Sequence, residues 1–171
     1  MALRIFATGG TFDKEYDEVK EVLYFGDTHL KQMLELGRST LNVDLRTLMM
    51  IDSLYMTEQD RQMILESCED APEEEIVIIH GTGTMTNTAR HLGEAGTSGS
   101  AVKDKTIVLT GAMVPYRFSD SDAIFNLGTA IAFAQVLHPG VYIAMNGRYF
   151  LWNNVQKNLN TGEFEEISGG Q

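Results

Sequence analysis

The chain has 171 residues, of which 43% are hydrophobic, and this fits one globular domain over residues 1–171 with a buried core. Its formal net charge is −11, with 24 acidic and 13 basic residues. Nucleic acids and anionic membrane surfaces bind clustered lysine and arginine, so this balance argues against both as partners.

Apolar runs alternate along the chain with stretches of helical periodicity. We expect strands over residues 2–7, 43–50, 76–80, 106–110 and 140–145, and helices over 28–36, 58–68, 84–94 and 121–137. Asp27 and the pair Thr57 and Asp60 indicate helix starts, and Gly37 and Pro139 indicate stops. The order predicts an α/β fold of three layers, with a mostly parallel sheet and helices on both faces.

Two segments depart from this alternation. Asn146-Gly147 predicts a hairpin after the last parallel strand, which adds an antiparallel edge. Residues 12–25 are charged and poor in glycine, and they carry Tyr16 and Tyr24 without a convincing period. A long loop of this kind is typical of a lid over a site, although an irregular surface excursion is the alternative.

The chain offers little sign of export or of a membrane. Its start lacks a basic segment followed by an apolar one, and the apolar stretch 123–137 is too short and too polar to span a bilayer. Cys68 is the single cysteine, so it forms no intrachain disulfide, and its place on an apolar helical stripe indicates a buried, inert thiol. We expect a cytoplasmic protein.

Two strands run directly into turns of glycine and threonine, Thr8-Gly9-Gly10-Thr11 and His80-Gly81-Thr82-Gly83-Thr84. Ligands of open parallel sheets bind beyond the carboxyl ends of the strands, where glycine permits close approach of the backbone. A threonine hydroxyl there is a nucleophile only if a base takes its proton. Tyr16 is the candidate to assist Thr11 and Tyr24 is its rival, while Lys105 is a candidate to stabilise charge or polarise a water near Thr82.

Other sites are less well supported. The four histidines show no metal-ligand spacing, and His80, before a glycine turn, is best interpreted as a structural imidazole. No metal or organic cofactor is expected. The pattern Gly81-x-Gly83-x-x-Thr86, with Asp104 further on, partly matches a dinucleotide fingerprint, but its third glycine is missing. A nucleotide-binding module therefore remains an alternative.

Three segments resemble the signatures of the bacterial-type L-asparaginase family, in order and spacing: Ala7 to Thr11, His80 to Met85 and Lys105 to Met113. The resemblance implies hydrolysis of L-asparagine to aspartate and ammonia, with a homodimer or homotetramer as the assembly. Thr11 would be the nucleophile, assisted by Tyr16 or Tyr24, and Thr82 and Lys105 would act on the hydrolytic water. It also implies substrate contacts, which would come from Gly10, Ser53, Gly81, Gly83 and Ala112.

The sequence also departs from the family. It resembles the N-terminal domain of members about twice as long, and we expect a short form without their C-terminal domain. Leu54 follows Ser53 where a polar substrate-binding residue is frequent, and Gly83 stands where the family has an aspartate that binds the substrate ammonium. We therefore expect impaired activity, because an unpartnered buried charge costs on the order of 3–5 kcal/mol. A catalytically silent protein that binds aspartate or asparagine is the main rival.

Overall fold

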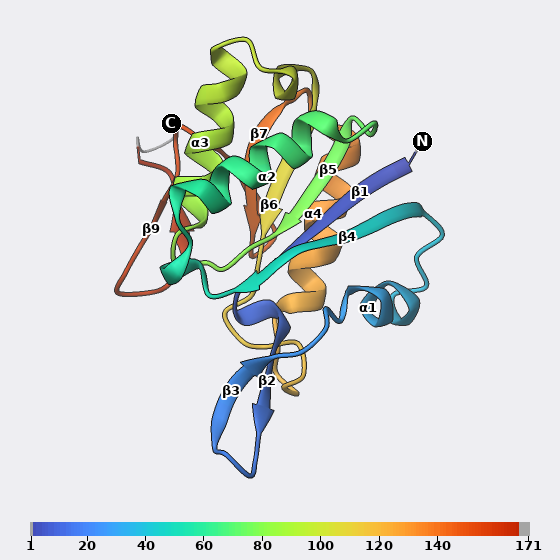
Figure 1. Cartoon of the computed structure of the whole chain (residues 1–171), viewed down its shortest axis with the longest axis vertical. Coiled ribbons are helices and arrows are strands. Elements are labelled where there is room, and N and C mark those ends of the chain that lie inside the picture. The colour runs from blue at the N-terminus through green and yellow to red at the C-terminus, as the bar shows by residue number, and fades with distance from the viewer. Residues whose placement is uncertain (1, 168–171) are drawn as a thin grey trace.

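A six-stranded sheet forms the centre of the computed structural model, which describes residues 2–167 (Figure 1). The strand order is β4-β1-β5-β6-β7-β8. The first five strands in this order pair in parallel, and β8 pairs antiparallel with β7. Their bounds are β1 Ala2–Gly9, β4 Asn42–Ile51, β5 Glu75–Ile79, β6 Thr106–Thr110, β7 Gly140–Met145 and β8 Arg148–Leu151.

Helices cover both faces of the sheet. Figure 1 shows α2 (Glu58–Asp70) in front of the strands and α4 (Ala123–Val136) behind them. Along β5, Ile76 and Ile78 pack in one core cluster with residues of α2 and α3 (Met85–Thr97). The alternate residues Val77 and Ile79 pack in a second cluster with α4 and α1 (Leu30–Leu36). The period of two along a strand thus divides the core, and the predicted three-layer α/β fold is confirmed.

The predicted elements agree closely with the structure, apart from one helix start. Thr57 and Asp60 form the expected capping box, with both reciprocal hydrogen bonds present. Asn146 and Gly147 both have positive φ, as a two-residue turn between antiparallel strands requires. Asp27 does not begin α1, which starts at Leu30. The backbone N–H of His29 donates instead to the carboxylate of Asp13, which fixes these residues outside the helix.

Residues 12–25 are more regular than the sequence indicates. After a short 3-10 turn, η1 (Thr11–Asp13), β2 (Lys14–Asp17) and β3 (Val22–Phe25) form an antiparallel hairpin. Figure 1 shows the hairpin projecting away from the body of the sheet. Its strands have four residues each, too few for a clear period. The hairpin's role as a lid stays a prediction.

Three short segments complete the fold. Two are 3-10 turns, η2 (Ser53–Tyr55) after β4 and η3 (Ala101–Asp104) before β6. The third is a ribbon of β9 (Gln156–Lys157) and β10 (Phe164–Glu165). Within residues 2–167, no helix has the length and apolar character needed to cross a bilayer.

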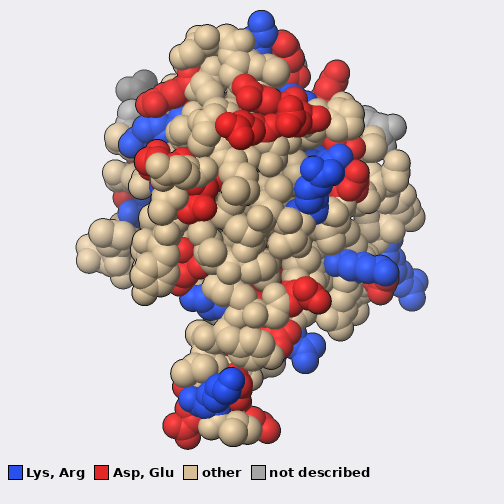
Figure 2. All heavy atoms as spheres, viewed as in Figure 1, with Lys and Arg blue, Asp and Glu red and all other residues tan. Residues whose placement is uncertain are grey.

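The surface and the single thiol fit the composition. On the face drawn in Figure 2, acidic side chains gather over the second half of α2, and basic side chains are dispersed.

Cys68 is fully buried in the cluster beneath α2, as expected, and burial raises the pKa of its thiol to about 12. The thiol is therefore protonated and unreactive in the folded protein.

Candidate active site

The two glycine–threonine turns meet at one cavity, as the sheet topology predicts. It lies beyond the carboxyl ends of β1, β4 and β5, the edge at which parallel sheets bind ligands. The cavity has a volume of about 190 Å³ and is lined by Thr11, Asp52, Ser53, Leu54, Gly81, Thr82, Gly83 and Lys157. It is large enough for a small metabolite.

The turns approach each other so closely that only glycine fits. Gly10 has φ +74°, and a Cβ atom there would lie 2.4 Å from the Cα atom of Gly81. A Cβ atom on Gly81 would in turn lie 2.5 Å from the Ser53 hydroxyl. Real Cβ contacts are never so short, so these glycines bring the first turn, the second turn and η2 together around the cavity.

We predict that Gly10→Ala destabilises the fold by about 3 kcal/mol or more, because it adds a backbone clash to a strained φ. Gly99→Ala is the matched control, since Gly99 has φ +96° but a Cβ atom there would meet no other atom of residues 2–167 within 4 Å. It is expected to cost about 1–2 kcal/mol. Urea unfolding of both variants checks this. Equal losses would show that the close approach to Gly81 has no energetic consequence.

Thr11 presents an unengaged hydroxyl to the cavity. It opens η1, is partly exposed, and its side chain has no hydrogen-bond partner within residues 2–167. Thr8, three residues earlier, is different, because its buried hydroxyl donates to the carbonyl of Ile79 at 2.8 Å. Of these two hydroxyls in the first turn, only that of Thr11 lines the cavity and is free to react.

Thr82 is paired with a lysine that the sequence did not single out. The Lys157 Nζ donates to the Thr82 Oγ1 at 2.9 Å, and that hydroxyl lies 3.5 Å from the sulfur of Met113. Burial lowers the pKa of Lys157, and no carboxylate oxygen of residues 2–167 lies within 4.0 Å of its ammonium. The pair can therefore polarise a water or stabilise developing negative charge.

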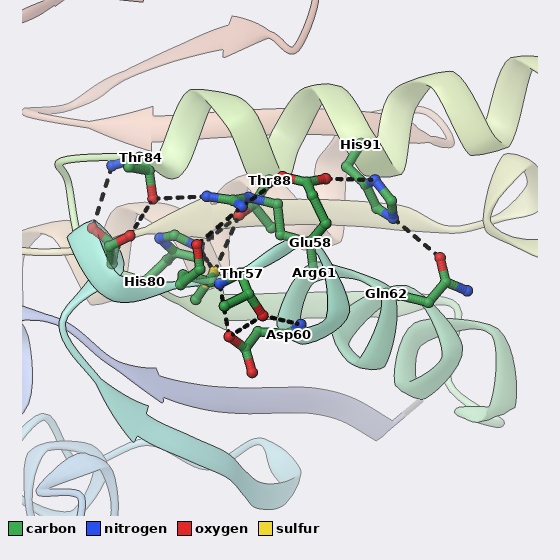
Figure 3. A network of polar contacts seen from close by, with 11 residues as sticks. Thr57, Glu58, Asp60, Arg61, Gln62, His80, Thr84, Thr88 and His91 are labelled. Carbon is green, nitrogen blue, oxygen red and sulfur yellow. Dashed lines mark hydrogen bonds and ion pairs between the residues drawn. The ribbon is translucent and has the colours of Figure 1, made fainter.

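A polar network behind the cavity fixes Ser53 and Thr84, and Figure 3 shows Thr84 beside Arg61 in this network. The Thr84 N–H donates to the Ser53 Oγ at 3.2 Å, and the Thr84 hydroxyl donates to the Ser53 carbonyl at 2.8 Å. Arg61, buried on α2, reaches the Thr84 hydroxyl at 3.2 Å and also contacts Glu58 at 2.8 Å. The start of α3 and η2 are thus held together, and Ser53 is oriented toward the cavity.

His80 belongs to the same network and is structural, as expected from its position. It is fully buried, with Nε2 2.8 Å from the Thr88 hydroxyl and Nδ1 2.8 Å from the Gly81 carbonyl. Burial lowers the pKa of this imidazole to about 4, so the ring is neutral at physiological pH. Within residues 2–167, no group of three or more His, Cys, Asp or Glu side chains is arranged to hold a metal ion.

We predict a specific loss of stability in acid from His80. The unfolded imidazole binds a proton at a pKa of about 6.5, whereas the folded one does so only near 4. Protonation therefore favours the unfolded state as the pH falls from 6.5 toward 4, and the His80 contribution between pH 7.5 and 5 is about 2 kcal/mol. Chemical unfolding of the parent and of His80→Gln checks the slope. An unchanged slope in His80→Gln would contradict the assignment.

The family model described as asparaginase, N-terminal, matches residues 2–168. The chain belongs to the asparaginase family. An L-asparaginase from Thermococcus kodakarensis is 29% identical over 175 residues, which cover 98% of this chain and 52% of that protein. A glutaminase-asparaginase from Acinetobacter glutaminasificans is 36% identical over 88 residues, covering 50% of this chain and 25% of the relative.

Solved asparaginase structures have the same fold. The thermostable L-asparaginase from Thermococcus kodakarensis matches with a TM-score of 0.84 at 28% identity, over 99% of this chain and 52% of that one. A probable cytoplasmic L-asparaginase from Campylobacter jejuni matches with a TM-score of 0.81 at 25% identity, over 98% of this chain and 53% of that one. The chain thus spans about half the length of these asparaginases.

One asparaginase residue assignment from the sequence does not fit the structure. Lys105 precedes β6 and so lies at the amino edge of the sheet, opposite the cavity. Its buried ammonium donates to the carbonyls of Ala71 at 2.5 Å and Glu73 at 2.9 Å. Lys105 therefore clamps the loop before β5, and Lys157 is the lysine beside Thr82.

Three other sequence expectations also fall outside the cavity. Ala112 is buried in the second core cluster and does not line the cavity. Asp104 lies in η3 at the amino edge, remote from the glycine turn, so the partial dinucleotide fingerprint has no acid where a ribose would bind. Tyr16 lies on the projecting hairpin with 52% of its surface exposed, and it is not among the lining residues.

The rival tyrosine of the hairpin is held by a carboxylate. The Tyr24 hydroxyl donates to Glu15 at 2.7 Å, and a second oxygen of Glu15 lies 2.7 Å from the Nε2 of His29. The hydrogen bond to Glu15 raises the pKa of Tyr24. Neither tyrosine lines the cavity in this conformation, so either would need a movement of the hairpin to reach Thr11.

Proposed function

We propose that this chain carries the hydrolytic site of an amidohydrolase that converts L-asparagine to L-aspartate and ammonia through an acyl-threonine intermediate. Its strongest support is that the free hydroxyl of Thr11 and the Thr82–Lys157 pair line the same cavity at the carboxyl edge of the sheet. A nucleophile and a proton-transfer pair in one cavity are the minimum that acyl transfer requires.

The proposed reaction has two steps. The Thr11 oxygen attacks the side-chain amide carbon, and the carbonyl becomes an oxyanion that nearby backbone N–H groups and the Lys157 ammonium stabilise. The C–N bond then breaks, and ammonia leaves with the proton that the hydroxyl gave up. Water next attacks the ester, and its proton passes by way of the Thr82 hydroxyl, which the Lys157 ammonium orients, to the departing Thr11 oxygen. Aspartate leaves as the Thr11 hydroxyl re-forms. A hairpin tyrosine, Tyr16 or Tyr24, would assist the first deprotonation on closure.

Activity on L-asparagine is expected to be impaired because residue 83 is a glycine. The substrate carries an ammonium beside its carboxylate, and a glycine offers it no counter-charge. The one carboxylate lining the cavity, Asp52, is already paired with Lys14 at 2.6 Å. That ion pair lowers the pKa of Asp52 and leaves its charge compensated. A catalytically silent binding protein on the same scaffold remains the second candidate for this reason.

A panel of L-asparagine, L-glutamine and their D-forms tests the proposal, with ammonia release as the readout and calorimetric binding of L-aspartate beside it. Measurable ammonia release from an amide that is lost in Thr11→Val supports the hydrolase. Binding of aspartate without any release would instead support the silent binding protein.

We also propose a homodimer or homotetramer in the cytoplasm. An apolar surface on α4 and β8 supports the assembly, because Phe125 and Tyr149 there are 60% and 47% exposed. Tyr149 packs edge-on against Phe133 of α4 at 5.0 Å, so the two elements share this surface. The relative from Campylobacter jejuni, which is titled a probable cytoplasmic L-asparaginase, supports the location. Analytical ultracentrifugation checks the assembly, and a monomer at micromolar concentration would contradict it.

A further inference from the structure

We propose that the cavity selects amides that carry a carboxylate but no ammonium group, the ω-monoamides of simple dicarboxylic acids. This inference rests on the proposed function and names its substrate class. On this view Gly83 and Leu54 alter specificity, and weak activity on L-asparagine is one consequence.

The charges of the cavity favour an anionic substrate. Lys157 and Asp52 are the two ionisable side chains that line it within residues 2–167. Asp52 is neutralised by Lys14, and its other oxygen accepts the Leu54 N–H at 3.0 Å. Lys157 contacts a neutral hydroxyl and has no acidic partner within 4.0 Å in this part of the chain. The uncompensated charge is thus positive, which attracts a carboxylate and repels an ammonium.

The hydroxyl groups add to this preference. The Ser53 Oγ already accepts the Thr84 N–H at 3.2 Å, so its own hydrogen is available for donation. The Thr82 Oγ1 accepts from Lys157, and its own hydrogen is donated to the Met113 sulfur at 3.5 Å, a weak acceptor. An ammonium needs several acceptors, whereas a carboxylate needs donors, and these side chains offer mainly donors.

The wall of the cavity formed by Leu54 and Gly83 is apolar. The Leu54 side chain lies against Gly83, with its Cδ2 2.9 Å from where a Cβ atom of residue 83 would stand. Leu54 is 70% exposed and lines the cavity, although a leucine at such a site gains little from burial. This wall therefore presents a methyl group to the cavity and no side-chain hydrogen-bond acceptor. A methylene of the substrate fits there, and an ammonium would lose its hydration without replacement.

The test compares succinamate with L-asparagine, which differ in the ammonium group alone. We expect kcat/KM of the unaltered protein to favour succinamate by about tenfold or more. Gly83→Asp should shift this ratio toward L-asparagine by about a hundredfold relative to Gly83→Asn. The two variants have side chains of equal size, so both displace Leu54, and only the first adds a charge. A preference of the unaltered protein for L-asparagine, or equal ratios in the two variants, would overturn the inference.

Binding of the two reaction products, succinate and L-aspartate, distinguishes a failure of this inference from a failure of the proposed function. If neither amide releases ammonia, the hydrolase proposal fails, but calorimetry with succinate and L-aspartate still measures the selectivity of the cavity in the unaltered protein. Tighter binding of succinate supports the inference even then. Equal binding, tighter L-aspartate binding, or no binding of succinate counts against it. The comparison needs no variant, so misfolding of a substituted chain cannot obscure the outcome.

Discussion

Thr11→Val is expected to reduce amide hydrolysis by about 10⁴-fold or more, to the limit of an ammonia assay, because it removes the attacking oxygen. The substitution is nearly isosteric. The Thr11 hydroxyl has no hydrogen-bond partner within residues 2–167, so its loss leaves no buried polar group unpaired. The free energy of unfolding should change by less than about 1 kcal/mol. The loss of turnover would then be chemical.

Thr11→Ser is the matched control for this result. It keeps the hydroxyl and loses only the methyl group, so measurable turnover should survive with a lower rate, since serine is less restricted in its χ1 rotamer. Brief reaction with the amide followed by acid quench and peptide mass analysis should find the acyl group on the peptide containing residue 11 in the parent. Undiminished turnover by Thr11→Val would remove Thr11 from the mechanism.

Lys157→Met and Lys105→Met are expected to change different properties of the protein, turnover in the first variant and stability in the second. Lys157 contacts Thr82 at the cavity, so its loss should lower kcat by about 10²–10³-fold, as the removal of one stabilising donor does. Its stability cost should be small, because burial already disfavours the charge and lowers the pKa of this lysine. Ammonia release under saturating substrate measures the first effect, and urea unfolding measures the second.

Lys105→Met should instead weaken the fold and leave kcat nearly unchanged. Its ammonium donates to two carbonyls of the loop before β5, and methionine would leave both without that donor. An unsatisfied buried acceptor costs about 1–3 kcal/mol. Kinetics must therefore be measured below the melting temperature of this variant. If Lys105→Met lost turnover at full stability while Lys157→Met kept it, the assignment of the two lysines would be reversed.

The error over Lys105 has a simple physical origin. The lysine belongs to a segment that resembles a family signature, but it stands before a parallel strand whose other end faces the cavity. A strand of five residues spans about 16 Å at the usual rise. Residues before and after such a strand cannot serve the same site. The strand direction, which the sequence indicates, already places Lys105 at the edge of the sheet opposite the cavity.

Lys157 was missed for a different reason. It lies in β9, a strand of two residues within a polar segment, where no apolar period is possible. Its position depends on pairing with β10 and on contact with Thr82, 75 residues earlier in the chain. The strands β5 and β6, in contrast, are short apolar runs with a glycine within two residues of their ends, which a local pattern reveals. Local patterns thus predicted the sheet and the two threonine turns, and long-range contacts completed the site.

Leu54 and Gly83 illustrate the same limit. Each was noticeable in the sequence as a separate departure, 29 residues apart in numbering. The structure brings the Leu54 methyl group into the space that a side chain at residue 83 would occupy. The two positions are therefore coupled, and substitutions at one should be interpreted with the other in mind.

The buried thiol of Cys68 provides an internal reporter for all of these variants. The chain has one cysteine, it is fully buried, and its pKa of about 12 suppresses the thiolate. A thiol reagent can therefore modify the native protein only when the core opens, and the labelling rate measures the free energy of that opening in native buffer. A substitution that impairs chemistry alone will keep the parent rate of labelling, whereas one that loosens the fold will accelerate it.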